Sequence, residues 1–444
     1  MSRFFGRLLV LTVLITSIFR PAFAQNLSLI SDAETERMIR DFAAPVFAAA
    51  GLTTDSVSVH IVNDRALNAF VAGGQRIFLF TGLLVEADHP GQIIGVLAHE
   101  TGHISGSHLA RTQDALRGAN AIAVVAAVLG IAAAVAGGGG AAGAAVLGGG
   151  TQIAGQSILQ YSRVQESAAD QAAVRFLEDT GQSARGLIEV MEKLGDQEAL
   201  LRRNQSTYGR THPLSRDRIL ALERLTIQSA SRDAAPPPEQ VATFDRVRAK
   251  VLAFLDPKKA LRKFAESDSS VPARYARAIA NHRLTNPTRA IEEIDTLIAD
   301  FPDDPFFHEL KGQILFENGG RDAAIPPHRE AVRLAPHEPL LRVALGQALV
   351  AMNDRILNDE AIIHLEEAVR INRDLAGAWG QLAIAYGRDE QLGMSSLASA
   401  EQAMGVGRTG DARAHATRAE RLLPVGSPGH IRAQDILSAA KPRR

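Results

Sequence analysis

Residues 90–105 read Pro-Gly-Gln-Ile-Ile-Gly-Val-Leu-Ala-His-Glu-Thr-Gly-His-Ile-Ser, and this stretch decides how the N-terminal half of the chain is interpreted. Pro90 is typical of the first position of a helix, and we expect that helix to run to about Asp114. His99 and His103 are four positions apart and therefore lie on one helical face, where both imidazoles can bind a single metal ion. Glu100 projects beside them, where its carboxylate can accept a proton from a water molecule. This spacing is typical of metallopeptidase helices.

A catalytic zinc ion needs a third protein ligand. Leu109 stands six residues after His103, where some zinc peptidases carry a third histidine, and His108 is expected to point away from the two-histidine face. Glu166 and Asp170 share a face of a later helix. We expect Glu166 to ligate one Zn²⁺ per chain and Asp170 to accept the free N–H of a ligand histidine. Without the upstream motif, both would be interpreted as solvated surface carboxylates.

The amino-acid composition limits the number of domains and the kinds of site that the chain can form. The 444 residues exceed the size of one compact domain, so two or more are expected. With no cysteine, disulfides, thiolate metal sites and cysteine nucleophiles are excluded. A net charge of −1 gives no basic excess, so no general binding of nucleic acid is expected.

Residues 1–24 predict a cleaved signal peptide, with an apolar run over 8–19 and Ala22-Phe23-Ala24 at its end. An uncleaved N-terminal anchor is the alternative.

Residues 25–228 are expected to form a domain of mixed helices and strands. The pattern predicts a helix over 31–50, a strand over 57–61, and a hairpin of 70–71 with 77–81. The strand over 76–81 is expected to border the cleft and to accept an extended peptide at its edge, and an ordinary edge or core strand is the alternative. Residues 118–162 contain no charge and are rich in alanine and glycine. They are interpreted as a buried or partly disordered helical hairpin, with membrane contact and a membrane span as alternatives.

The C-terminal half shows a helical repeat. A proline-rich linker over 229–240 precedes a domain over 241–438, in which Ala290 and Ala324 are 34 residues apart and Ala361 and Ala412 continue the series. This period resembles tetratricopeptide repeats, although His328 occupies a position that is usually apolar. The longer step before Ala412 predicts an unpaired extra helix over 379–386. A helical domain without repeats is the alternative.

The motifs together resemble a known family. The His99-Glu100-x-x-His103 motif, Glu166-x-x-x-Asp170, and the upstream Asn68-Ala69-Phe70 and Gly73-Gly74 are similar to gluzincin peptidases of the HtpX and CAAX-prenyl-endopeptidase type. The export signal and the repeats narrow this resemblance to the periplasmic β-barrel assembly-enhancing proteases. It implies an α+β, mostly α, zincin-like metallopeptidase domain followed by an all-α tetratricopeptide-repeat solenoid.

The resemblance also implies site residues. His99, His103 and Glu166 would be zinc ligands, with Glu100 as general base. His212 would either fill the fourth zinc position in a resting enzyme or stabilise the transition state, and an ordinary loop role is the alternative.

The implied function is a zinc endopeptidase of the periplasm that degrades misassembled outer-membrane proteins and assists their assembly through its repeats. The implied partners are unfolded outer-membrane proteins, the outer-membrane β-barrel assembly machinery and a membrane surface contacted peripherally. Two alternatives stay open. One is a repeat-based periplasmic chaperone or scaffold with a latent metal site, and the other is an integral membrane peptidase.

Overall fold

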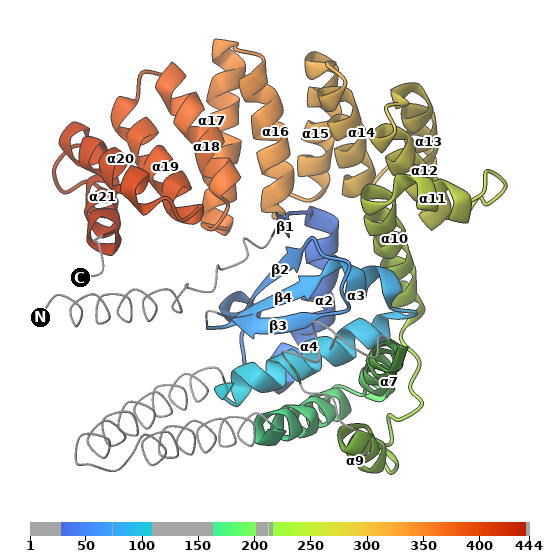
Figure 1. Cartoon of the computed structure of the whole chain (residues 1–444). Coiled ribbons are helices and arrows are strands. Elements are labelled where there is room, and N and C mark those ends of the chain that lie inside the picture. The colour runs from blue at the N-terminus through green and yellow to red at the C-terminus, as the bar shows by residue number, and fades with distance from the viewer. Residues whose placement is uncertain (1–27, 73, 109–162, 201–211, 213–215, 441–444) are drawn as a thin grey trace, which may run out of the picture.

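The computed structural model of the chain describes residues 28–72, 74–108, 163–200, 212 and 216–440 (Figure 1). The expected signal peptide and the uncharged stretch over 118–162 lie outside these residues. A small sheet with its helices is followed by an all-α region, as the fold class predicted. None of the described helices combines the length and the apolar character needed to cross a membrane.

The sheet has four strands in the order β1-β2-β4-β3, namely β1 (Leu29–Ile30), β2 (Ser58–Val62), β4 (Arg76–Phe80) and β3 (Ala69–Ala72). β4 pairs in parallel with β2 and antiparallel with β3. The expectation that residues 76–81 accept a peptide as the edge strand is therefore wrong, and the alternative of a core strand holds, since β4 is enclosed on both sides and β3 is an edge of the described sheet. Alternating side chains show which face is buried, but they do not reveal which strands are neighbours.

Helices pack on one face of the sheet, where Ile77 and Leu79 are fully buried. Asp32 caps helix α2 (Ala33–Ala49) by accepting a hydrogen bond from the backbone N–H of Thr35 at 2.8 Å, close to the predicted start. The other helices around this core are α3 (Thr81–Glu86), α4 (Pro90–Ser105), a helix over residues 163–179, α7 (Arg185–Leu200) and α9 (Arg216–Thr226).

Helix α4 ends at Ser105, earlier than the expected end near Asp114. Gly106 closes the helix, and Ser107 takes a positive φ of 52°. This left-handed residue turns the chain back on itself. The turn changes the direction of His108 relative to a continued helix, and the site therefore differs from the expectation at this residue.

Helix α10 (Pro238–Leu255) connects the two halves of the chain (Figure 1). Its Phe244 and Val247 belong to the core that α2 and α4 share, whereas its Leu252 belongs to the first core of the all-α region. Arg246 donates hydrogen bonds to Glu34 of α2 and to Asp304, each at 2.5 Å. The segment after the proline-rich linker is thus packed against both regions.

The all-α region curves over the sheet as a series of helix pairs (Figure 1). The short helix α11 (Pro257–Lys263) precedes five pairs: α12 (Val271–Arg283) and α13 (Pro287–Asp300), α14 (Pro305–Glu317) and α15 (Arg321–Leu334), α16 (Pro339–Ala351) and α17 (Arg355–Ile371), α18 (Ala376–Arg388) and α19 (Leu392–Gly405), α20 (Thr409–Leu422) and α21 (Pro428–Ala439). Fully buried alanines at the predicted repeat positions, such as Ala290 and Ala324, allow the paired helices to approach closely.

The unpaired extra helix over 379–386 is not present. These residues belong to α18, which packs against α19. Ala398 of α19 follows Ala361 by one repeat, but Gln402 stands at the position where the pattern expects an apolar residue. Ala412 lies on α20, which packs against both α19 and α21. The polar substitution in α19 therefore hid one helix and made its neighbour look unpaired.

Candidate metal centre

Two helices carry most of the candidate site, and a glycine sets their separation. The histidine motif lies on α4, and Glu166 and Asp170 lie on the helix over 163–179. A Cβ atom placed on Gly102 would be 2.8 Å from the backbone oxygen of Ala169, so only glycine permits this close approach. The neighbouring turns of both helices therefore face each other across a very short gap.

Four side chains converge within this gap. His99 Nε2 and His103 Nε2 are 3.1 Å apart, and each is 3.4 Å from a carboxylate oxygen of Glu166. His212 Nδ1 lies 3.3 Å from His99 Nε2 and 3.1 Å from Glu166 Oε1. Four ligands of one tetrahedral zinc ion would be about 3.3–3.6 Å apart, given typical zinc–ligand distances. The donor types and their spacing therefore fit one zinc ion.

Glu100 lies beside this cluster and is fully buried. Neither of its carboxylate oxygens has a hydrogen-bond partner among the described residues, and Nε2 of His212 lies 3.4 Å from Oε1. Burial raises the pKa of Glu100 above its ordinary value. A carboxylate with unused lone pairs next to a metal-binding cluster can accept a proton there.

Asp170 contacts His99 on the far side of its ring. The Nδ1 atom of His99 is 3.0 Å from Asp170 Oδ1, which leaves Nε2 to face the cluster. A carboxylate in this position can orient an imidazole toward a metal ion, the role that the sequence analysis expected for Asp170.

Arg218 is the residue that the sequence analysis missed. It donates from Nε and Nη2 to the two oxygens of Asp170, both at 2.8 Å, and its Nη1 lies 2.9 Å from Glu166 Oε2. Its side chain is 9% exposed, so the guanidinium is held between two buried carboxylates. The available signal is its helical spacing, since Arg218, Leu222 and Thr226 share the buried face of α9.

The pKa values of the two motif histidines shift in opposite directions. Burial lowers the pKa of His99, but Asp170 and Glu166 outweigh it and raise the pKa to about 10. Burial and the neighbouring His99 lower the pKa of His103 to about 2. Burial raises the pKa of Glu166, yet His212 and His99 hold it well below its ordinary value. A metal ion would take the place of the His99 proton, because a ligating imidazole is neutral.

His108 does not point away from the site, which corrects the sequence-based expectation. The turn at Gly106 and Ser107 folds the chain back, so that His108 Nδ1 lies 3.0 Å from His103 Nδ1. Gln165, next to Glu166, donates a hydrogen bond to the backbone oxygen of His108 at 3.0 Å. His103 thus has a polar contact on the ring nitrogen that does not face the cluster, as His99 has with Asp170.

Comparisons with known proteins give a consistent result. Residues 30–226 match the model of Peptidase family M48. A similar protein of Vibrio cholerae is 26% identical over 296 residues, which are 64% of this chain and 59% of that protein. The beta-barrel assembly-enhancing protease of Escherichia coli (strain K12) is 23% identical over 380 residues, or 83% of this chain and 75% of that protein. The mitochondrial metalloendopeptidase OMA1 of Schizosaccharomyces pombe is 25% identical over 178 residues, or 40% of this chain and 49% of that protein.

Proposed function

We propose that this chain, whose residues 30–226 match the model of Peptidase family M48, is a zinc-dependent endopeptidase. The observation that carries the proposal is the convergence of ligand atoms from His99, His103, Glu166 and His212 within 4.8 Å of one another, with Glu100 alongside. A surface cluster of carboxylates would not bring three buried or partly buried histidines to one point.

The chemistry follows from these positions. When bound, zinc would supply Lewis-acid polarisation of the scissile carbonyl and acidify water. Glu100 accepts the proton of the attacking water and passes it to the leaving amine. Asp170 and Arg218 hold His99 and Glu166 in place, so that the ligand geometry is set before substrate arrives.

The position of His212 supports a resting state of the enzyme. A catalytic zinc ion needs one open position, and His212 occupies the fourth position of the cluster while also lying beside Glu100. We infer that His212 in this conformation keeps water from Glu100. Movement of the chain at residue 212 would open the site. A transition-state role is the alternative for the same side chain.

The biological proposal rests on the named relatives and on the sequence. Similarity to β-barrel assembly-enhancing proteases over most of the chain supports action on misassembled outer-membrane proteins and contact with their assembly machinery. The signal-like residues 1–24 support a periplasmic location. A repeat-based scaffold with a latent metal site is the second candidate. The position of His212 favours this candidate if His212 never leaves the fourth ligand position.

One experiment separates these functions. We expect purified wild type and Glu100→Gln each to bind about one equivalent of zinc, while Glu100→Gln cleaves casein or a misfolded porin about 10²–10⁴-fold more slowly. Glu178→Gln, an exposed carboxylate on the helix that carries Glu166, is the matched control and should cleave normally. Full activity in Glu100→Gln would reject the mechanism. If wild type binds zinc without cleaving, activation by His212→Ala supports the resting state, whereas continued inactivity supports the scaffold.

A further inference from the structure

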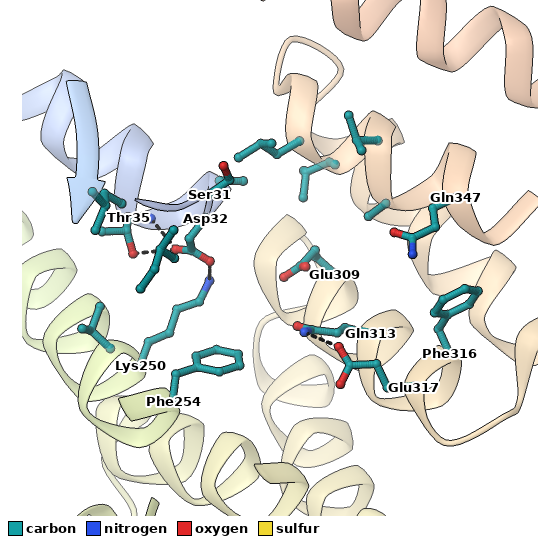
Figure 2. Close-up of a pocket in the computed structure, with 18 of the residues that line it drawn as sticks. Ser31, Asp32, Thr35, Lys250, Phe254, Glu309, Gln313, Phe316, Glu317 and Gln347 are labelled. Carbon is teal, nitrogen blue, oxygen red and sulfur yellow. Dashed lines mark hydrogen bonds and ion pairs between the residues drawn. The ribbon is translucent and has the colours of Figure 1, made fainter. Parts of the chain in front are cut away.

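A second polar site lies between the sheet domain and the helix pairs. It is a cavity of about 370 Å³, within the usual range of small-ligand pockets. Ser31 and Asp32 at the start of α2 and Lys250 of α10 form one wall, and residues of α14, α15 and α16 form the other (Figure 2). None of the four residues in the candidate metal cluster lines it.

Most charges in this cavity are already paired. Lys250 Nζ lies 2.5 Å from Asp32 Oδ2 and 3.1 Å from Glu34 Oε2. Glu317 accepts a hydrogen bond from Gln313 at 2.8 Å, and its other oxygen is 2.9 Å from His282 Nε2. The single lysine is thus committed to the carboxylates of α2 and offers little charge to a ligand.

Glu309 differs from these groups. It lines the cavity from α14, and in the part of the chain that the structure describes it has neither a hydrogen bond nor an ion pair. Figure 2 shows its carboxylate within the cavity, on the opposite wall from the dashed contact between Lys250 and Asp32. A partly buried carboxylate without a partner favours a ligand that brings N–H donors.

His328 is a second and independent indication. This residue occupies a repeat position that is usually apolar, is 3% exposed and lines the cavity, and its Nδ1 has no hydrogen-bond partner among the described residues. Its ring lies against Gly312, where a Cβ atom would be 2.6 Å from Cε1, so the imidazole is held in place. Burial lowers its pKa to about 4, so at neutral pH it is uncharged and has one acceptor nitrogen.

The rest of the lining is apolar. Phe254 of α10, Phe316 of α14 and Leu340 of α16 supply surface on which the hydrocarbon stem of a long side chain can pack. Unpaired acceptors inside an apolar enclosure select against an anion, which would face Glu309 and Glu317. They also select against a purely apolar ligand, which would leave Glu309 unpaired.

We propose that this cavity binds an arginine side chain carried on an apolar segment of a polypeptide. The guanidinium group has five N–H donors in a planar fork and no acceptor, which matches a carboxylate and an imidazole acceptor with no partner of their own. Because the two walls belong to the sheet domain and to the helix pairs, a bound segment would contact both. The inference goes beyond the proposed peptidase function and does not depend on the metal centre.

The test measures peptide binding to the full-length chain. The probe is a fluorescently labelled nonapeptide with a central Leu-Arg-Leu, compared by anisotropy with the same peptide carrying citrulline or glutamate in place of arginine. Citrulline keeps the shape of arginine and removes its charge. We expect the arginine peptide to bind at least about tenfold more tightly than either, because each replacement removes the positively charged donor that faces the carboxylate. Mass spectrometry confirms that the peptides stay intact.

Two variants connect the binding to this cavity. Glu309→Gln should abolish the preference for arginine over citrulline, whereas Glu292→Gln, an exposed carboxylate on α13, should leave it unchanged. His328→Leu restores the apolar residue of the repeat and should weaken arginine binding several-fold while the chain stays folded by circular dichroism. Equal binding of arginine and citrulline peptides by wild type overturns the proposal. An unchanged preference in both folded variants also overturns it. Since the readout is binding, failure of the cleavage assay has no influence on this result.

Discussion

Glu166 and Asp170 in the candidate metal centre each contact a histidine and Arg218. In contrast, Glu309 in the cavity between α2 and α14 contacts no charged partner among the described residues. Both sites nevertheless place three carboxylates against one basic residue of fixed charge, Arg218 in the first and Lys250 in the second. The number of carboxylates is therefore the same in both sites, and this number alone does not determine what each site would bind.

The difference lies in how close the donor atoms are. In the metal centre, nitrogen and oxygen atoms from three chain segments converge to separations of 3.1–3.4 Å, which suits one small divalent ion. In the cavity, the carboxylates are separated by open space and aromatic surface, which suits an organic cation. Two buried acidic sites in one chain thus favour different cations because their geometry differs, and the following substitutions test that contrast.

Removing Arg218 should have the largest effect. Arg218→Met leaves Glu166 and Asp170 buried without their shared cation, and we expect the free energy of unfolding of the metal-free protein to fall by about 3–5 kcal/mol. Zinc affinity should also drop by about 10–100-fold, because the contacts that orient the ligands are lost. Urea unfolding in the presence of a chelator measures the first quantity, and competition with a chromophoric chelator measures the second.

Two further variants make the Arg218 result interpretable. Arg218→Lys keeps the charge but not the bidentate geometry, so it should recover only part of the loss. Arg216→Met, at an exposed position on the same helix, should change stability by no more than about 0.5 kcal/mol. An Arg218→Met protein with wild-type stability and zinc affinity would show that the metal centre does not rely on internal pairing, and the contrast with the cavity would fail.

The two sites also differ in how far the sequence predicts them. His99 and His103 are recognisable because helical spacing alone places them together, and Glu166 and Asp170 have the same local relationship. The contact between His108 and His103 was missed because it depends on the left-handed turn at Ser107. Arg218 was missed because its partners are 48 and 52 residues away in sequence, beyond the reach of any local pattern.

The cavity and the order of the strands could not be predicted either, because both depend on contacts between residues that are far apart in sequence. The cavity brings together Asp32, Lys250, Glu309 and Gln347, which become neighbours only when the helix pairs curve over the sheet. Only His328 gave a signal, as a polar residue at an apolar repeat position. Helices and most repeat positions could be predicted because the spacing of their apolar residues is visible within a short stretch of sequence. The position of β4 in the sheet instead depends on its pairing with β2, a separate segment of the chain.

A smaller effect is expected where α4 meets the helix over 163–179. Gly102→Ala places a methyl group 2.8 Å from the Ala169 backbone oxygen, so the two helices must separate, at a cost of about 1–3 kcal/mol. Gly195→Ala on α7 is the matched control, since a Cβ atom there has no heavy atom within 4 Å. It should gain about 0.5–1 kcal/mol from reduced chain entropy.

Zinc affinity and arginine-peptide affinity, measured for these two glycine variants, distinguish the metal centre from the cavity. Zinc affinity should fall in Gly102→Ala and stay unchanged in Gly195→Ala, while arginine-peptide binding should be unchanged in both. If Gly102→Ala also weakens peptide binding, the two sites are coupled through the packing of the sheet domain and cannot be treated as independent.

The smallest effect concerns the pH dependence of stability at Glu309. Burial raises the pKa of Glu309 from its ordinary value of 4.5 to about 7, against the attraction of Lys250, and the carboxylates of Asp32, Glu34 and Glu317 contribute in the same direction as burial. The folded state therefore binds the Glu309 proton more tightly than the unfolded state does. It follows that the free energy of unfolding decreases as pH rises from about 4.5 to about 7 and changes little from this group above that range.

Glu309→Gln removes this dependence, so the difference in unfolding free energy between variant and wild type should grow in favour of the variant across that pH range, by on the order of 1–2 kcal/mol. Taking the difference cancels every other titrating group that the substitution leaves unchanged. Saturating arginine peptide should reduce the growth of this difference, because a bound cation favours the ionised carboxylate. If the difference is the same at pH 5 and pH 8, Glu309 is already neutralised by a partner in solution, and the cavity would resemble the metal centre in having no unpaired charge.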